Sequence, residues 1–419
     1  MEKEKGRILL VTTQKGDTPM EANARILPQS QILKEWHLEV KENFWEADAK
    51  PHIRLLLKEF MERTMIQELS EILSRERYES TQEDGVYRNG FYERGLVTQF
   101  GLIENLQVPR IREGRIFKTS VFKRYRRFQD IVEDMIRDVF LAGISTRRVG
   151  EAISKLLDTD VSSGTVSNIT KKLDEKVRAF HKAPILDEYQ YLILDGIVLK
   201  ILYGARYHKR RVLAVYGITV FGERKLLAFK QAKGESQSAW ESLLWNLYER
   251  GLKGECLKLI VMDGSAGLRV AAELVYPEAK IQRCWVHKLR NVSNYCRKKY
   301  EKDLIAGARK IYLAENKIQA ITRFKAWKKI WEKICPEAVR CIEKDLEELL
   351  NFLDCPNTHR IRIRTTNAIE RSFREIRRRT KVFTCFSNSA SSDRIIYAIF
   401  THLNNSWKDR PLKQFTQFD

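Results

Sequence analysis

Two aspartates, Asp195 and Asp263, lie in or directly after predicted buried strands, where a carboxylate could bind a metal ion. Asp195 interrupts the apolar run Tyr-Leu-Ile-Leu-Asp-Gly-Ile-Val-Leu at residues 191–199, and an isolated charge is costly to bury there unless a cation compensates it. Asp263 follows Leu-Ile-Val-Met and precedes Gly264, at the strand end where ligand-binding groups of mixed sheets gather. An exposed Asp on an edge strand and a turn-forming Asp-Gly are the alternatives. Because the two predicted strands should be neighbours, we favour a shared metal site.

A third acid, Glu370, lies in a very basic helical segment at residues 360–381. Helical spacing places it beside an apolar stripe, on a second stripe with three cations. The apolar stripe is Ile369, Phe373 and Ile376, and the second stripe is Glu370, Arg374, Arg377 and Lys381. Glu370 could instead simply pair with Arg374 one turn on. Glu375 is the competing acid, but it lies nearer the apolar stripe.

These three acids offer hard oxygen donors without a histidine-rich set, which favours Mg²⁺ or Mn²⁺ over zinc. Two such ions, about 4 Å apart, would hold a phosphodiester between them. We therefore expect Asp195, Asp263 and Glu370 to be both the metal ligands and the catalytic residues.

Cys284 and His287 form a further possible motif, Cys-Trp-Val-His. They could be half of a zinc site with Cys296 and His359 as conceivable partners, but a structural cluster is the preferred interpretation. All seven cysteines lie in the second half of the chain without a repeated short spacing. A disulfide framework is therefore not expected.

The charge balance favours a polyanionic partner. Lys and Arg number 76 against 55 Asp and Glu, a net charge of +21, and neutralising phosphates supplies sequence-independent affinity. A merely basic soluble surface is the alternative. The residues that we expect to contact double-stranded DNA are Arg147, Arg148, Ser167, Asn168, Lys171, Lys172, Arg374, Arg377, Arg378 and Lys381.

The spacing of apolar residues predicts an α/β fold in the middle of the chain. We expect strands at 189–203, 211–221, 224–230, 257–262 and 280–286, with helices at 238–250 and 266–275. Three antiparallel strands followed by crossover units make a mixed sheet flanked by helices. Residues 287–357 should be almost wholly helical, and the basic segment at 360–381 should end the last helix of the fold.

The N-terminal part should be mostly helical. We expect a helix at 52–77 and a small hairpin turning at Asn89-Gly90. A helix from Ser145, a break at 158–161 and a second helix capped by Ser162 or Ser163 outline a helix-turn-helix, whose second helix would enter a major groove. An ordinary helical hairpin has the same outline.

Several motifs resemble those of prokaryotic insertion-sequence transposases of the Mutator-like family. The most specific are Asp263-Gly-Ser-Ala-Gly-Leu and Gln282-Arg-Cys-Trp-Val-His. Others are Gly85-Val-Tyr-Arg-Asn-Gly, Gly143-Ile-Ser-Thr-Arg, Glu235-Ser, Arg250-Gly-Leu and Thr366-Asn-Ala-Ile-Glu. The resemblance runs from about residue 53 to residue 407. Gly196 stands where relatives often carry Ala, and Ser387 where Pro is frequent.

The resemblance implies a ribonuclease H-like catalytic core with an all-α insertion between the second Asp and the Glu. It places the family's acidic triad on Asp195, Asp263 and Glu370. It also implies binding to terminal inverted repeats and to target DNA, homo-oligomers of at least two copies, and divalent metal. A domesticated, non-catalytic DNA-binding regulator and a plain nuclease of the same fold are the alternative functions.

The expected domains follow the changes of pattern along the chain. They are a variable lead segment (1–50), a helix and hairpin region (51–127), a helix-turn-helix DNA-binding domain (128–183), the first part of the catalytic core (184–287), a helical insertion (288–357) and the last part of the core (358–419). No window is apolar enough to span a bilayer, so we expect a cytoplasmic, nucleoid-associated protein.

Overall fold

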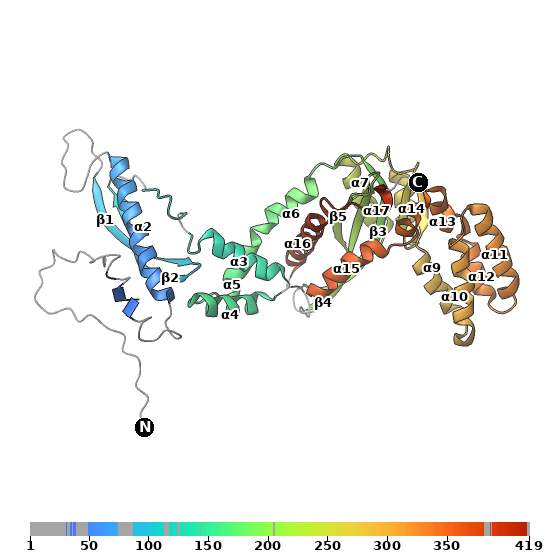
Figure 1. The fold of residues 1–419 in the computed structure, drawn as a ribbon, viewed down its shortest axis with the longest axis horizontal. Coiled ribbons are helices and arrows are strands. Elements are labelled where there is room, and N and C mark those ends of the chain that lie inside the picture. Colours follow the sequence, from blue (N-terminus) through green and yellow to red (C-terminus); the bar gives the residue numbers. More distant parts are fainter. Residues whose placement is uncertain are drawn as a thin grey trace, which may run out of the picture. The chain divides into compact units, whose positions relative to one another are not determined.

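The computed structural model divides into two compact units, which are residues 1–134 with 153–160, and residues 135–152 with 161–419 (Figure 1). The structure describes residues 31, 34–35, 37–38, 49–73, 87–112, 117–123, 126–142, 144–203, 206–380, 386 and 388–416. The predicted lead segment lies almost entirely outside these residues. No helix in the described ranges is long and apolar enough to cross a membrane.

The first unit packs helix α2 (Ala49–Leu73) against a hairpin of β1 (Arg88–Thr98) and β2 (Gly101–Ile111). Its apolar core contains Met61, Met65, Leu96, Ile103, Leu106 and Val108. The hairpin was predicted, but its predicted turn at Asn89-Gly90 is wrong. Thr98 pairs with Gly101 at the actual turn, whereas Gly90, with φ +65°, lies in a register shift inside β1. Asn-Gly favours positive φ in a bulge as well as in a tight turn.

Four helices follow the hairpin: α3 (Asp130–Leu141), α4 (Thr146–Leu157), α5 (Ser163–Lys171) and α6 (Leu173–Lys182). The predicted order of helix, short break and helix is confirmed for α4 and α5. Ser162 is the N-cap of α5, because its hydroxyl oxygen accepts a hydrogen bond from the backbone N–H of Thr165 at 3.1 Å. Gly150 of α4 allows close packing before α5, since a Cβ there would lie 2.4 Å from the carbonyl oxygen of Val161.

The second unit is built on a mixed five-stranded sheet in the order β5-β4-β3-β6-β7. Its strands are β3 (Tyr189–Tyr203), β4 (Arg206–Thr219), β5 (Arg224–Ala232), β6 (Leu259–Met262) and β7 (Lys280–Arg283). The first three form an antiparallel meander, while β6 and β7 extend the sheet in parallel from β3. The sheet type and strand sequence predicted from the apolar runs are therefore confirmed.

Helices cover the sheet on both faces. Helices α7 (Gln237–Glu249) and α8 (Ala266–Val275) bury one face in a core rich in leucine, which includes Leu192, Leu194, Leu213, Leu243 and Leu268. Helices α15 (Asn367–Thr380) and α16 (Ser389–Trp407) pack against strands β3, β4 and β5. Side chains alternate along a strand, so the odd-numbered residues of β3 from Tyr191 onward face away from the leucine core.

Between β7 and α15 the chain is helical, as predicted. The elements are α9 (Trp285–Asn294), α10 (Lys298–Tyr312), α11 (Lys317–Trp331), α12 (Pro336–Glu343), α13 (Leu346–Leu350), the 3-10 turn η1 (Asn351–Asp354) and α14 (Asn357–Ile363). Several element ends differ from the predicted ones by two to five residues, and two expectations around this segment were wrong. Strand β7 ends at Arg283 because α9 already begins after Cys284, and the basic helix α15 is followed by α16 and α17 (Lys413–Thr416), so it is not the last.

Candidate active site

Asp195 and Asp263 lie at the same level on neighbouring parallel strands. Ile193 of β3 pairs with Val261 of β6, and each aspartate comes two residues later. Because side chains alternate between the two faces of a sheet, both carboxylates lie on the face opposite the leucine core. The Oδ1 atom of Asp195 accepts the backbone N–H of Gly196 at 2.8 Å. The adjacency expected from the topology is therefore present.

The surroundings of Asp195 bring the third acid to the same place. Burial raises the pKa of Asp195 to about 7. The hydrogen bond from the backbone N–H of Gly196 and the positive charge of His287 lower this pKa, but burial outweighs them. The charges of Asp263 and Glu370 raise this pKa further, as like charges do at short range. The sheet and α15 thus bring all three carboxylates into one half-buried region.

Glu370 is held by two residues from different elements. The Thr366 hydroxyl, just before α15, donates to Oε1 of Glu370 at 3.0 Å, and Nε2 of His287 on α9 lies 3.5 Å from the same oxygen. The rival acid, Glu375, instead forms 3.0 Å ion pairs with Arg378 and Arg379. Glu370 is therefore the acid of α15 that the structure brings to the aspartate pair.

A compact cluster of three residues contacts Glu370 and consists of Cys284, His287 and Thr366. The buried Cys284 thiol accepts the backbone N–H of Thr366 at 3.3 Å. A hydrogen bond with Cys284 raises the pKa of His287 to about 9, and the charges of Asp195 and Glu370 act in the same direction. Burial raises the pKa of Cys284, but hydrogen bonds with His287 and Thr366 outweigh it and the net shift is downward. The imidazole is therefore positively charged at neutral pH.

The conceivable zinc partners of this cluster lie elsewhere. The sulfur of Cys296 is 3.0 Å from that of Cys335, and the His359 ring stacks on Phe415 with centroids 3.8 Å apart. Neither residue completes a zinc site with Cys284 and His287. Among the described residues, no group of three or more His, Cys, Asp or Glu side chains is placed so that it could hold a metal ion. A metal at the three carboxylates would thus require their side chains to turn toward one another.

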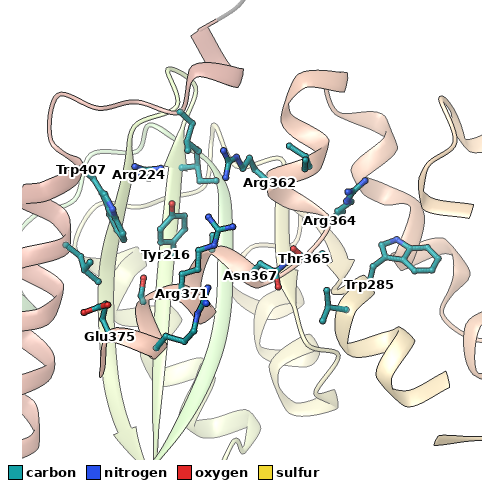
Figure 2. Close-up of a pocket in the computed structure, with 18 of the residues that line it drawn as sticks. Tyr216, Arg224, Trp285, Arg362, Arg364, Thr365, Asn367, Arg371, Glu375 and Trp407 are labelled. Atoms are coloured by element: carbon teal, nitrogen blue, oxygen red, sulfur yellow. The ribbon is translucent and has the colours of Figure 1, made fainter. Parts of the chain in front are cut away.

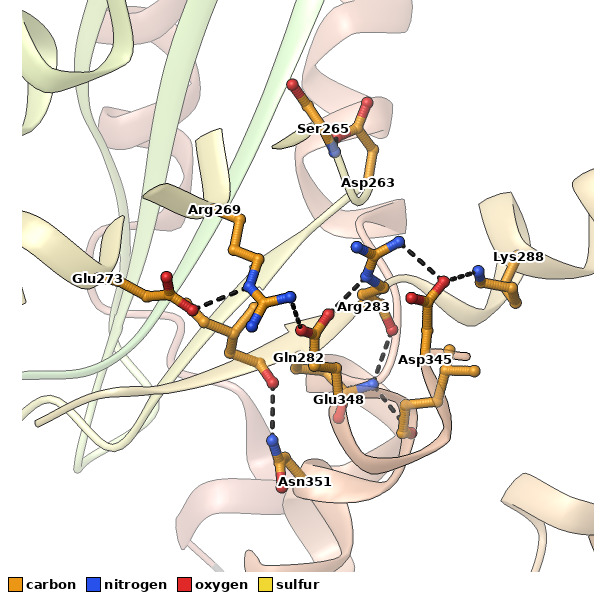
Figure 3. A network of polar contacts seen from close by, with 12 residues as sticks. Asp263, Ser265, Arg269, Glu273, Gln282, Arg283, Lys288, Asp345, Glu348 and Asn351 are labelled. Carbon is orange, nitrogen blue, oxygen red and sulfur yellow. Dashed lines mark hydrogen bonds and ion pairs between the residues drawn. The ribbon is translucent and has the colours of Figure 1, made fainter. Parts of the chain in front are cut away.

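Arg283 connects the Asp263 turn to the helical insertion (Figure 3). Its guanidinium forms ion pairs with Asp345, at 2.9 Å, and with Glu348. Gly264 lies directly against this guanidinium, because a Cβ there would be 2.9 Å from Nη1 of Arg283, and its φ of +97° also favours glycine. The residue after Asp263 is thus fixed by a neighbour from β7.

The residues predicted to contact DNA fall on two helical surfaces. Ser167 is half-buried, and the exposed ones near α4 and α5 are Arg147, Arg148, Asn168, Lys171 and Lys172. On α15 the exposed ones are Arg374, Arg377 and Arg378, while Lys381 lies outside the described residues. These positions are accessible to a nucleic acid.

The second unit also contains a basic cavity of about 830 Å³, whose lining does not include the three acids (Figure 2). Tyr216 of β4 lines the cavity. It lies two residues after Ala214, which pairs with Asp195 of β3, so Tyr216 and Asp195 are on the same face of the sheet. The cavity therefore begins on the face of the sheet that carries Asp195. Four of its arginines were not among the sequence predictions: Arg224, Arg362, Arg364 and Arg371. Arg362, Arg364 and Arg371 lie in the basic segment at 360–381, but no helical stripe singled them out, and Arg224 comes from β5, far from that segment in the sequence.

Comparison with known proteins identifies the family. Residues 30–410 match the model of the family described as "Transposase, Mutator family". The chain is 34% identical to the transposase for insertion sequence element ISRM5 of Rhizobium meliloti, covering 85% of this chain and 89% of that protein. It is 35% identical to the transposase for insertion sequence element IS406 of Burkholderia multivorans, covering 81% of this chain and 87% of that protein. It is 30% identical to the transposase for insertion sequence element IS256 in transposon Tn4001 of Staphylococcus aureus, covering 81% of this chain and 86% of that protein. The chain therefore belongs to the Mutator family of transposases.

Proposed function

We propose that this transposase cleaves DNA strands at the ends of a mobile element and joins them to target DNA, using Asp195, Asp263 and Glu370. The observation that carries this proposal is the convergence of the three carboxylates on one face of the sheet. Two come from adjacent parallel strands, and the third comes from a helix that follows the insertion. Such a group of acids has no evident structural purpose, because each raises the cost of ionising the others.

A pair of Mg²⁺ or Mn²⁺ ions fits these residues in charge and donor type. The carboxylates provide only hard oxygen ligands, and the charge of Asp195 is disfavoured by burial and by its neighbours, so a cation would stabilise it. Bound there, the metal would activate the attacking oxygen and stabilise the leaving oxygen of a phosphodiester. Asp195, Asp263 and Glu370 would hold the metal.

Other residues of the site have supporting roles in this proposal. Thr366 and His287 orient Glu370 through contacts to the same oxygen, Oε1. The positive charge of His287 also offsets part of the negative charge of the acids. Cys284 in turn fixes the imidazole through their hydrogen bond. A ligand oriented by such neighbours is held in one geometry rather than sampling several.

The fold and the remaining surfaces support the same function. The strand order β5-β4-β3-β6-β7, with the helical segment inserted between Asp263 and Glu370, supports a ribonuclease H-like core. Helices α4 and α5 would bind the terminal inverted repeats, and the net charge of +21 suits a DNA-binding protein. Because an element has two ends to bring together, we propose that at least two copies of the chain act together.

Strand cleavage by the purified protein tests the proposal. The substrate is DNA that carries the gene with its flanking sequences, in the presence of Mg²⁺. Asp195→Asn, Asp263→Asn and Glu370→Gln should each abolish cleavage and leave DNA binding largely intact. Glu375→Gln is the matched control on the same helix and should cleave.

Each contrary result points to a different conclusion. Retained cleavage in any of the three variants would contradict the assigned triad. Hydrolysis without joining to target DNA would indicate a plain nuclease. Binding without cleavage by the unmodified protein would indicate a regulator that has lost its chemistry.

A further inference from the structure

The basic cavity on the Asp195 face of the sheet is lined by two kinds of side chain that bind nucleic acids, which are cationic groups and aromatic rings. Six arginines and one glutamate provide its charged lining, together with four aromatic side chains (Figure 2). The arginines are Arg224, Arg362, Arg364, Arg371, Arg374 and Arg378, and the aromatic residues are Tyr216, Trp285, Tyr312 and Trp407. All of these residues belong to the second unit.

The positive charge of three cavity arginines is uncompensated within the described chain. The one acid of the cavity, Glu375, is already paired with Arg378 and Arg379. Across the described ranges, no carboxylate lies within ion-pair distance of Arg224, Arg371 or Arg374. The Nε atom of Arg224 is also buried without a hydrogen-bond partner among these residues. Such a set of cations calls for an anionic ligand.

The aromatic side chains favour a ligand with flat rings. Trp407 packs edge-on against Tyr216 with ring centroids 5.6 Å apart, and the guanidinium of Arg224 lies 5.3 Å from the Trp407 ring. The guanidinium of Arg364 lies 4.8 Å from the Tyr312 ring. Trp407 and Tyr312 are only half-buried, so their rings remain partly accessible. Nucleic-acid bases stack on such rings, but only when they are unpaired.

The cavity is also correctly placed for DNA held at the carboxylates. Successive residues of a helix are rotated by about 100°, so Arg374 lies on the same stripe of α15 as Glu370 and Arg371 on the side next to it. On the sheet, Tyr216 follows Ala214, the pairing partner of Asp195, on the same face. A strand leaving the carboxylates along this face would enter the cavity.

We infer that this cavity binds an unpaired segment of a DNA strand, with its phosphates on the arginines and its bases on the aromatic rings. The inference deepens the proposed function and rests on it. A volume of about 830 Å³ is typical of a site for one small ligand, which suits a few nucleotides but not a duplex. The substrate that reaches the carboxylates would therefore be locally unpaired DNA.

Binding of labelled DNA to the full chain tests this inference by fluorescence anisotropy without added metal. The probes are a mixed-sequence single strand of about ten nucleotides and the same sequence as a duplex. Arg224→Gln combined with Arg371→Gln should weaken single-strand binding about tenfold or more and change duplex binding less than about twofold. The slope of log affinity against log salt should fall by about 1.4 for the single strand, since two phosphate contacts are lost.

The matched control for charge is Arg309→Gln combined with Arg340→Gln, which removes two exposed arginines of the insertion and should leave single-strand binding unchanged. Trp407→Ala should weaken single-strand binding by about five- to a hundredfold, from the stacking of one base. Trp407→Phe should restore much of this loss, which separates stacking from a folding defect. Trp245→Ala is the aromatic control, because Trp245 is an exposed residue of α7, the helix that covers the opposite face of the sheet.

The outcomes separate this inference from the proposed function. Unchanged single-strand binding in both cavity variants would overturn the inference, and so would equal losses for single strand and duplex. Asp195→Asn should bind the single strand like the unmodified protein. If the cavity variants behave as expected while the unmodified protein fails to cleave DNA with Mg²⁺, then the inference holds and the proposed chemistry fails.

Discussion

Thr366→Val tests whether the cluster that contacts Glu370 sets the metal affinity of the active site. Valine matches the shape of threonine but cannot donate the 3.0 Å hydrogen bond to Oε1 of Glu370. The backbone bond from the Glu370 N–H to the Thr366 carbonyl oxygen is unaffected, so α15 should still begin at the same place. The substitution therefore frees the carboxylate without removing the helix that carries it.

The expected effect follows from the charge of the acceptor. A hydrogen bond to a charged group contributes about 1.5–3 kcal/mol, which corresponds to about 10- to 100-fold in an equilibrium constant. Losses of this size are typical when a residue that orients a metal ligand is replaced. Thr366 is fully buried, so water cannot readily take over its contact.

The assay is DNA strand cleavage as a function of Mg²⁺ concentration. The concentration giving half the maximal rate should rise about 10- to 100-fold in Thr366→Val, with a maximal rate close to that of the unmodified protein. Ser372→Ala is the control, since this buried hydroxyl of the same helix has no hydrogen-bond partner in the described part of the chain. An unchanged Mg²⁺ dependence in Thr366→Val would refute the reasoning. A lower maximal rate at unchanged half-maximal Mg²⁺ would refute it as well.

Three further predictions concern other parts of the molecule. Lys171→Ala combined with Lys172→Ala should weaken duplex DNA binding and reduce its salt slope by about 1.8, as measured by anisotropy. Burial raises the pKa of Asp393 to about 6, so its ionisation destabilises the fold progressively as the pH rises from about 4 to 6. Asp393→Asn should therefore raise the free energy of unfolding by up to about 3 kcal/mol at pH 7.5 and little at pH 4, as measured by urea denaturation. The sulfurs of Cys296 and Cys335 are 3.0 Å apart. An added diazene oxidant should therefore take two hydrogens and two electrons from these two thiols, forming a disulfide and a hydrazine. Titration of free thiols should then find two fewer per chain.

Each of these predictions has a control. Lys298→Ala with Lys299→Ala removes two exposed lysines of α10, and a salt slope equal to that of the Lys171 and Lys172 variant would contradict a specific role for α5. Equal stability gains for Asp393→Asn at both pH values would contradict the cost of burying its charge. Cys296→Ser should abolish the loss of thiols, and loss that persists in this variant would rule out the proposed pair.

The sheet and the aspartate pair could be predicted because their signals are local. The apolar runs around Asp195 and before Asp263 mark buried strands, and the order of the elements leaves few ways to arrange them. Strand adjacency then places both acids on one face. The hairpin was predicted for the same reason, but its turn was not, because the local preference of Asn89-Gly90 for positive φ does not distinguish a bulge from a turn.

The contacts around Glu370 could not be predicted, because they depend on the tertiary fold. Thr366 reaches Cys284 across 82 positions of sequence and His287 across 79, and neither spacing follows from the helical or strand period. The cysteine and histidine motif was recognised, yet its contact partners, which decide between a zinc site and a structural cluster, lie in another element. Five of the six cavity arginines lie between residues 362 and 378, but their sharing of one cavity with Arg224 of β5 depends on the tertiary fold in the same way.

In the proposed function, helix α15 would connect the chemistry of this site to the position of the DNA. It carries Glu370 and the cavity residues Arg371 and Arg374 within about one turn, so these side chains cannot move independently by more than their own rotamers allow. A strand held by the arginines would also restrain the helix, and with it the carboxylate. Sites built on rigid helices hold their geometry better than sites on loops. DNA bound in the cavity would therefore be held in a fixed relation to Glu370, and the three carboxylates could come together around a metal by changes of side-chain rotamer alone.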